Sequence, residues 1–76
     1  MYYVGIDIGS TASKVAVYDE NKKDFVELFM IPTGWSGVET ASKILEILKE
    51  KNINKDNSYF VGTGYGRVSI EYANDT

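Results

Sequence analysis

Three short segments of β-strand character follow one another at the N-terminal end of the chain. Residues 2–8, 13–19 and 25–31 are rich in aromatic and β-branched side chains, which favour strands. The breaks between them are a tight Gly-Ser-Thr turn after Ile8 and a charged turn over residues 20–24. A parallel connection needs a dozen or more residues, so such short breaks permit only antiparallel pairing. The first segment is almost continuously apolar, which predicts a strand buried on both faces.

A helix and a further strand follow this meander. Ser36 and Glu39 have the spacing of a capping box, and the apolar residues behind them recur at helical spacing: Val38, Ala41, Ile44, Leu45, Ile47 and Leu48. We expect a helix from about residue 37 to 51, with Trp35 packed as a lid over its start. Residues 58–62 predict a fourth strand, and residues 68–73 the first turns of a second helix.

These elements predict an α/β fold with a mixed sheet. A helical crossover from the third to the fourth strand places the fourth strand parallel to the first and beside it, giving the order 3-2-1-4. A chain of 76 residues buries only about 60% of its surface and supports one modest core. One full helix covers one face, so the other face is expected to be largely bare and to favour self-association. Residues 1–76 are therefore interpreted as part of an incomplete, truncated domain.

Composition excludes several classes of function. Eight basic and eleven acidic residues give a net charge of −3, which does not favour binding to nucleic acid or to an anionic membrane. The chain has no cysteine and no histidine, which excludes disulfides, Cys/His metal ligation and a Ser-His-Asp triad within these residues. The apolar runs are far shorter than the roughly 20 residues of a membrane span, and no signal-peptide pattern is present. A cytoplasmic location is expected.

The strongest candidate site is the end of the first strand. Asp7 closes the strand, and Gly9, Ser10 and Thr11 form the turn that follows. Gly9 allows a phosphate to approach the backbone, the turn amides and hydroxyls can donate to it, and Lys14 can add a positive charge. An acidic side chain beside a phosphate requires a cation between them, so Asp7 is a candidate Mg²⁺ ligand, directly or through water. A purely structural interpretation, in which Asp7 caps the turn that Gly9 permits, is about equally supported by the residue types.

A second glycine-rich turn follows the fourth strand. Residues 62–67 read GTGYGR, and ligands often gather where such a turn follows a parallel strand. Gly64 and Gly66 can adopt positive φ, and Arg67 can donate to a phosphate or carboxylate. Tyr65 is the one tyrosine within a candidate functional loop. The alternative is a tight strand-to-helix connection with Arg67 as a surface charge, and position alone favours that alternative.

The two turns together carry a family resemblance. Residues 3–14, YVGIDIGSTASK, resemble the first phosphate motif of the actin, sugar kinase and heat-shock chaperone superfamily of ATPases. Combined with GTGYGR at residues 62–67, the pattern is similar to the ATP-dependent activators of 2-hydroxyacyl-CoA dehydratases and the related subunits of benzoyl-CoA reductase. The resemblance spans essentially the whole chain, and the pair of motifs is more specific than the first motif alone.

The resemblance implies a ribonuclease H-like fold, repeated twice in the full protein, with ATP in the cleft between the repeats. It implies that Gly9, Ser10 and Thr11 contact the β- and γ-phosphates and that Lys14 is a phosphate neighbour. Asp7 is implied to be the catalytic residue that serves the Mg²⁺–water network.

The same resemblance implies partners and cofactors. Activators of this family are homodimers that hold one four-iron four-sulfur cluster between subunits and use ATP hydrolysis to drive an electron into a partner dehydratase or reductase. The cluster cysteines, the second phosphate motif and the adenosine-binding segment lie downstream in the family and are absent here. We therefore expect the chain itself to bind ATP weakly and to hydrolyse none measurably.

Two alternatives remain open at the level of sequence. A fragment of a sugar or N-acetylhexosamine kinase from the same superfamily would need an aspartate as base, and neither Asp56 nor Asp75 is obviously placed for that role. The other alternative is a non-enzymatic interaction module or an independent small domain, which would be a stable monomer that does not bind nucleotide.

Overall fold

The strands pair in the predicted order. The computed structural model describes all residues from Met1 to Thr76. Its four strands are Tyr2–Ile8 (β1), Ala12–Asp19 (β2), Asp24–Pro32 (β3) and Ser58–Thr63 (β4), and they form one sheet in the order β3-β2-β1-β4. β1 pairs antiparallel with β2 and parallel with β4, and β2 pairs antiparallel with β3. The mixed α/β sheet predicted from the short turns is thus confirmed.

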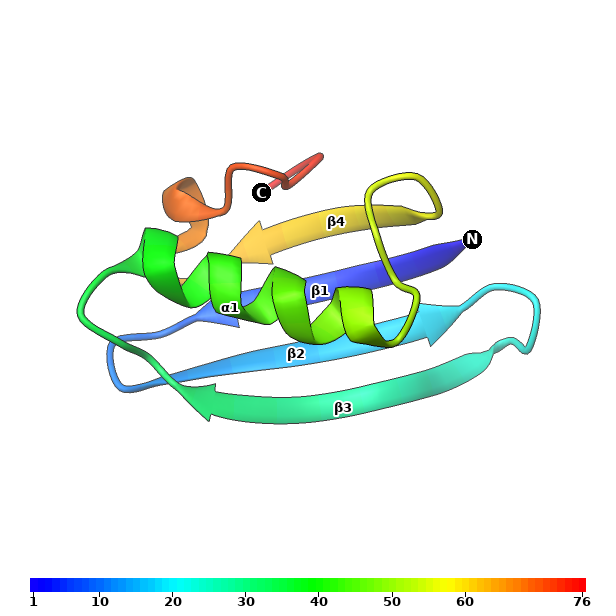
Figure 1. Cartoon of the computed structure of the whole chain (residues 1–76), viewed down its shortest axis with the longest axis horizontal. Coiled ribbons are helices and arrows are strands. Elements are labelled where there is room, and N and C mark those ends of the chain that lie inside the picture. The colour runs from blue at the N-terminus through cyan, green and yellow to red at the C-terminus, as the bar shows by residue number, and fades with distance from the viewer.

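One helix covers one face of this sheet (Figure 1). The helix Gly37–Glu50 (α1) begins at Ser36, whose hydroxyl accepts a hydrogen bond from the Glu39 amide at 3.1 Å, as the capping pattern predicts. The core between α1 and the sheet consists of buried apolar residues from every main element except β3: Val4, Ile6, Ile8, Val15, Val17, Ala41, Ile44, Leu48, Ile53, Phe60 and Ile70. The helix ends at Glu50, one residue before its expected end, and Asn52 follows with φ 63°. No helix of the chain combines the length and the apolar character that crossing a membrane requires.

The opposite face of the sheet has no covering element. We call it the open face; it carries the outward-pointing residues of all four strands, namely Tyr3, Gly5, Asp7, Lys14, Ala16, Tyr18, Phe25, Leu28, Met30, Tyr59, Val61 and Thr63. Leu28 is 72% exposed and Met30 62% exposed. The bare face expected from a single helix is therefore present. β1 is buried on one face only, because no helix or second sheet covers Tyr3 and Gly5. The prediction of a strand buried on both faces is therefore wrong for this chain.

The segment after β4 does not begin a helix, contrary to the prediction for residues 68–73. It forms one 3-10 turn, Arg67–Ser69 (η1), and then runs beside β4. The Phe60 amide donates to the Asn74 side chain at 2.7 Å, and the Gly62 amide donates to the Asp75 carbonyl at 2.9 Å. The extended path supplies partners to the outer backbone groups of β4, which a helix at this place could not do.

Trp35 is fully exposed, so the prediction of a lid over the helix start is wrong. Thr40 fills the space under that start instead. Its hydroxyl accepts from the Gly34 amide at 3.0 Å and donates to the Ser36 carbonyl at 3.0 Å. Thr40 is buried and Val38 is exposed, which shifts the inner face of the helix relative to the apolar stripe in the sequence.

Candidate functional site

The first candidate residues lie together at the carboxyl end of β1. Asp7 is directly opposite Lys14 of β2 and Thr63 of β4 in the sheet register, and all three belong to the open face. Asp7 is half-buried and Lys14 is exposed. The two side chains form no ion pair; the one salt bridge in the chain joins Lys51 and Glu27 at 3.5 Å. The carboxylate and the ammonium group are thus both available to a ligand.

The turn between β1 and β2 presents unused hydrogen-bond donors. The Gly9 amide donates to the Ala12 carbonyl at 3.1 Å, which closes the turn. A Cβ atom on Gly9 would lie 2.8 Å from that carbonyl oxygen, so the tight closure requires glycine. Ser10 and Thr11 are exposed, and their amides and hydroxyls donate no hydrogen bond within the chain. Successive free donors of this kind form a concavity suited to an anion.

The second glycine-rich turn packs directly on this site. The Gly66 amide donates to the Ile8 carbonyl at 3.0 Å. A Cβ atom on Gly64, whose φ is +87°, would overlap the Asp7 carboxylate, and a Cβ atom on Gly66 would overlap the Ile8 side chain. These two glycines therefore allow a close approach that sets the position of Asp7. In Figure 1 the β1–β2 turn, the end of β4, η1 and the start of α1 all gather at one end of the molecule.

The remaining residues of that turn point outward. Tyr65 is 87% exposed, and the exposed Arg67 donates from Nη1 to the Gly64 carbonyl at 3.2 Å. This bond leaves the other guanidinium nitrogens free. The glycines of this turn therefore have a structural role, while the exposed Tyr65 and Arg67 are available to a ligand. The turn leads into η1 and not into the helix that the alternative interpretation assumed.

Sequence reasoning missed two residues that support the first turn, Ser13 and Thr33. The Ser13 hydroxyl is fully buried and lies 2.7 Å from the Thr33 hydroxyl, which donates to the Gly9 carbonyl at 2.8 Å. Ser13 could have been found, because it is a polar residue in alternation with the inward-facing Val15 and Val17. Thr33 gives no local signal, since its contact with the turn depends on the pairing of β2 with β3.

The chain's residues fit a magnesium ion and do not fit an iron–sulfur cluster. No group of three or more acidic, histidine or cysteine side chains encloses a metal site. Mg²⁺ is often held by one carboxylate together with water and substrate phosphates, and Asp7 beside the turn supplies that one carboxylate. An iron–sulfur cluster requires thiolate ligands, and the chain has no cysteine.

Comparison of sequences finds two close relatives. The chain is 40% identical over 73 residues to the (R)-2-hydroxyglutaryl-CoA dehydratase activating ATPase of Acidaminococcus fermentans. It is 41% identical over 76 residues to the activator of lactoyl-CoA dehydratase from Anaerotignum propionicum. These matches include 93% and 96% of this chain. The chain is homologous to part of the 2-hydroxyacyl-CoA dehydratase activators. No protein-family model matches it.

Solved structures of activators agree with this relationship. The A. fermentans dehydratase component A superposes with a TM-score of 0.76 at 34% identity over 99% of this chain. The activator of 2-hydroxyisocaproyl-CoA dehydratase from Clostridium difficile, solved with bound ADPNP, superposes with a TM-score of 0.78 at 35% identity over 99% of this chain. The sheet and helix thus match the N-terminal half-domain of the actin-like activator ATPases, as the resemblance predicted. The chain spans 27% to 29% of the length of these relatives.

Proposed function

We propose that residues 1–76 are the phosphate-binding N-terminal part of an ATP-hydrolysing activator of a 2-hydroxyacyl-CoA dehydratase or a related CoA-ester reductase. The observation that carries this proposal is the turn after β1, where unused amide and hydroxyl donors lie beside a free carboxylate. The 40% identity to an activating ATPase and the ADPNP bound to the C. difficile activator support ATP as the ligand.

Each residue of the first turn and its neighbours has its own role toward the nucleotide. Ser10 and Thr11 donate to the β- and γ-phosphates, while Gly9 lets the phosphates approach the backbone. Lys14, on the open face next to Asp7, neutralises phosphate charge. Asp7 holds Mg²⁺ directly or through water, and the ion when bound stabilises negative charge on the phosphates. Arg67 and Tyr65 border the site from the second turn.

Residues 1–76 supply only one side of a nucleotide site. Donors on one side of a phosphate give weak binding, and stabilisation of phosphoryl transfer requires charge on several sides. The chain itself is therefore expected to bind nucleotide weakly and to show no turnover, as an incomplete actin-like ATPase domain. In the whole cytoplasmic activator, a homodimer, hydrolysis drives electron transfer to the partner dehydratase. None of these 76 residues can ligate the iron–sulfur cluster of such a protein.

Nucleotide binding can be tested on the chain as it stands. Titration of the ¹⁵N-labelled chain with Mg·ADPNP should shift the amide resonances of residues 9–11 with a Kd on the order of 1 mM. Asp7→Asn should weaken binding in the presence of Mg²⁺ and have less effect without it. Asp56→Asn, in the exposed connector before β4, is the matched control. Shifts confined to residues away from both glycine-rich turns would contradict the assigned site.

Activator function requires a larger protein. A chimera in which this chain replaces the matching 73 residues of the A. fermentans activating ATPase should retain ATPase activity and activation of the dehydratase. Asp7→Asn in that chimera should lower kcat by about 10²- to 10³-fold, the usual loss when one preorganised charge contact to the reacting group is removed. A folded chimera that binds ATP and does not activate the dehydratase would refute the activator assignment.

A further inference from the structure

Thr33 holds the turn after β1 at two points. Its hydroxyl donates to the Gly9 carbonyl at 2.8 Å, and its backbone amide donates to the Thr11 carbonyl at 3.0 Å. These two carbonyls flank Ser10, the exposed residue at the tip of the turn. Thr33 lies just beyond β3 and is far from the turn in sequence, so the contact exists only because β2 and β3 pair as far as Ala12 and Pro32.

The contact with Gly9 fixes the direction of the next amide. In a planar trans peptide the C=O and the following N–H point in opposite directions. Because the Gly9 carbonyl points to Thr33, the Ser10 N–H must point away from Thr33. That amide has no partner within the chain. The Thr33 hydroxyl thus aims one of the donors that the proposed phosphate site uses.

The Gly9 carbonyl can only accept, and this fixes the directions of the hydrogen bonds between Gly9, Thr33 and Ser13. The Thr33 hydroxyl has one proton and donates it to Gly9, so the contact of 2.7 Å with Ser13 must be donated by Ser13. Ser13 is fully buried on the core side of β2. Ser13 therefore donates to Thr33, and Thr33 donates to Gly9. Hydrogen bonds linked in this way strengthen one another.

The next residues hold Thr33 in place from the other side. The Gly34 amide donates to the Thr40 hydroxyl at 3.0 Å, and Thr40 is buried in the first turns of α1. The segment between β3 and α1 is therefore tied to the helix immediately after Thr33. A support anchored in both the sheet and the helix restricts the motion of the turn that it holds.

We propose that Thr33, backed by Ser13, is a positioning residue that presents the Ser10 amide to the nucleotide phosphates. The inference rests on the proposed function for the ligand and on the geometry for the support. Thr33 does not touch phosphate in this arrangement, because its hydroxyl is committed to Gly9.

The support is tested without any ligand. Amide hydrogen exchange and ¹⁵N relaxation of residues 9–12 should show a more mobile turn in Thr33→Val, with exchange of the Gly9 amide faster by about tenfold, as expected for one lost hydrogen bond. Thr33→Ser should restore the wild-type values. Ser13→Ala should give a smaller change, and Ser58→Ala, which removes a buried hydroxyl at the opposite end of the sheet, should give none. Unchanged exchange at the turn in Thr33→Val would overturn the inference.

The effect on nucleotide is tested in the chimeric activator. A Ser10 amide that serves to bind ATP contributes uniform binding, and on this assignment Thr33→Val should raise KM for ATP by about tenfold and change kcat by less than about twofold. Thr33→Ser should restore KM, and a thermal melt should show both variants folded. A fall in kcat alone, or no kinetic change with a loosened turn, would overturn the positioning role. Failure of the wild-type chimera to bind ATP would refute the proposed function, while the exchange experiment would still decide whether Thr33 holds the turn.

Discussion

At the scale of single residues, Gly64 is the position least able to accept a side chain. Its φ is +87°, and a Cβ atom would overlap the Asp7 carboxylate and lie 2.6 Å from the Ile8 carbonyl oxygen. Gly64→Ala should lower the free energy of unfolding by about 1–3 kcal/mol and displace Asp7. Urea denaturation measures the first effect, and loss of the Mg²⁺ dependence of ADPNP binding measures the second.

Gly5 provides the matched control for this prediction. A Cβ atom at Gly5 would meet nothing within 4 Å, because the residue lies on the open face. Gly5→Ala should leave stability unchanged or raise it by about 0.5 kcal/mol, since alanine is less costly than glycine in a strand. Equal destabilisation by both substitutions would show that the contact with Asp7 is not the cause.

The candidate site could be predicted in part from single residues. The sequence places Asp7 next to a glycine turn and marks a second glycine turn after the fourth strand. Contact between the two turns follows from the parallel pairing of β1 with β4, which brings Asp7 beside Thr63. The role of Thr33 could not be predicted, because nothing in its neighbours indicates that it reaches Gly9 across the sheet.

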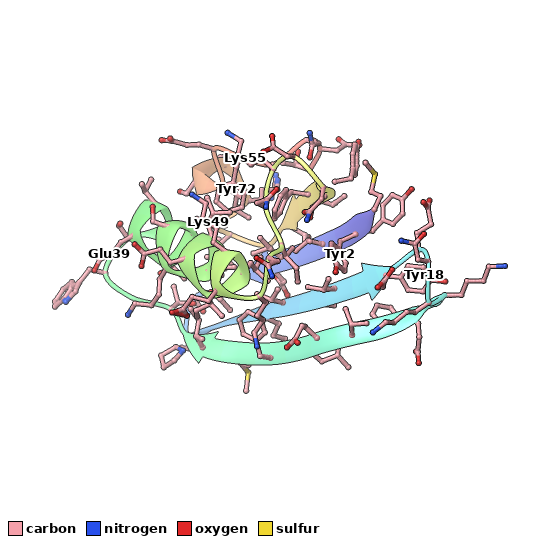
Figure 2. All side chains as sticks on the ribbon, turned by 45° about the vertical axis from the view of Figure 1, so that its right-hand side comes forward. Tyr2, Tyr18, Glu39, Lys49, Lys55 and Tyr72 are labelled. Atoms are coloured by element: carbon pink, nitrogen blue, oxygen red, sulfur yellow. The ribbon has the colours of Figure 1, made fainter.

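At the scale of elements, Tyr72 links the final segment to the helix. Its hydroxyl donates to the Ala41 carbonyl of α1 at 2.6 Å, and its ring packs edge-on against Phe60 of β4 with 5.1 Å between the ring centroids. Tyr72 is labelled beside α1 in Figure 2. Burial raises the pKa of Tyr72 above its ordinary value of 10.0. The folded state therefore keeps the phenol neutral, and the stability that it contributes is present below pH 10 and is lost as the pH rises above it.

Tyr72→Phe should accordingly have a pH-dependent effect. At pH 7 it should cost about 0.5–1.5 kcal/mol, the usual net value of one hydrogen bond. Above pH 10 the difference from wild type should shrink. Tyr3, whose pKa is raised by its hydrogen bond and charge interaction with Glu20, titrates alike in both proteins and cancels in the difference. Tyr65→Phe, at an exposed position, is the control, and a gap that stays constant to pH 11 would contradict burial of the Tyr72 phenol.

Most helices and strands could be predicted because their local sequence patterns favour the same structure as the tertiary packing around them. The strands and α1 have periodicity, turn residues and a cap that all favour the same structure. The segment after β4 is different, since Val68 to Ala73 follow a glycine-rich turn and are expected to begin a helix, but form no α-helix. There the unpaired edge of β4 and the burial of Ile70 decide the outcome, and both are tertiary effects.

At the scale of the whole molecule, the open face determines behaviour in solution. Leu28 and Met30 of β3 are mostly exposed there, and Tyr59 and Val61 of β4 lie on the same face with β2 and β1 between. Exposed apolar patches of this kind promote association. The weight-average mass in sedimentation velocity should therefore rise with concentration. Leu28→Lys should suppress the rise, whereas Val38→Lys, on the helix side, should not. A monomer at all concentrations would contradict this prediction.

The two outer edges of the sheet also differ. Along β4, the amides of Phe60 and Gly62 are already paired with Asn74 and Asp75, while β3 pairs on one side only. A foreign strand can join β3 without competition, yet must displace the chain's own residues to join β4. If two copies paired through their β3 strands, both unpaired edges would lie inside the dimer. The edges left outside would be the two β4 edges, which residues 74 and 75 of each copy already cover. Growth by strand addition would therefore terminate at two copies instead of propagating into a fibre.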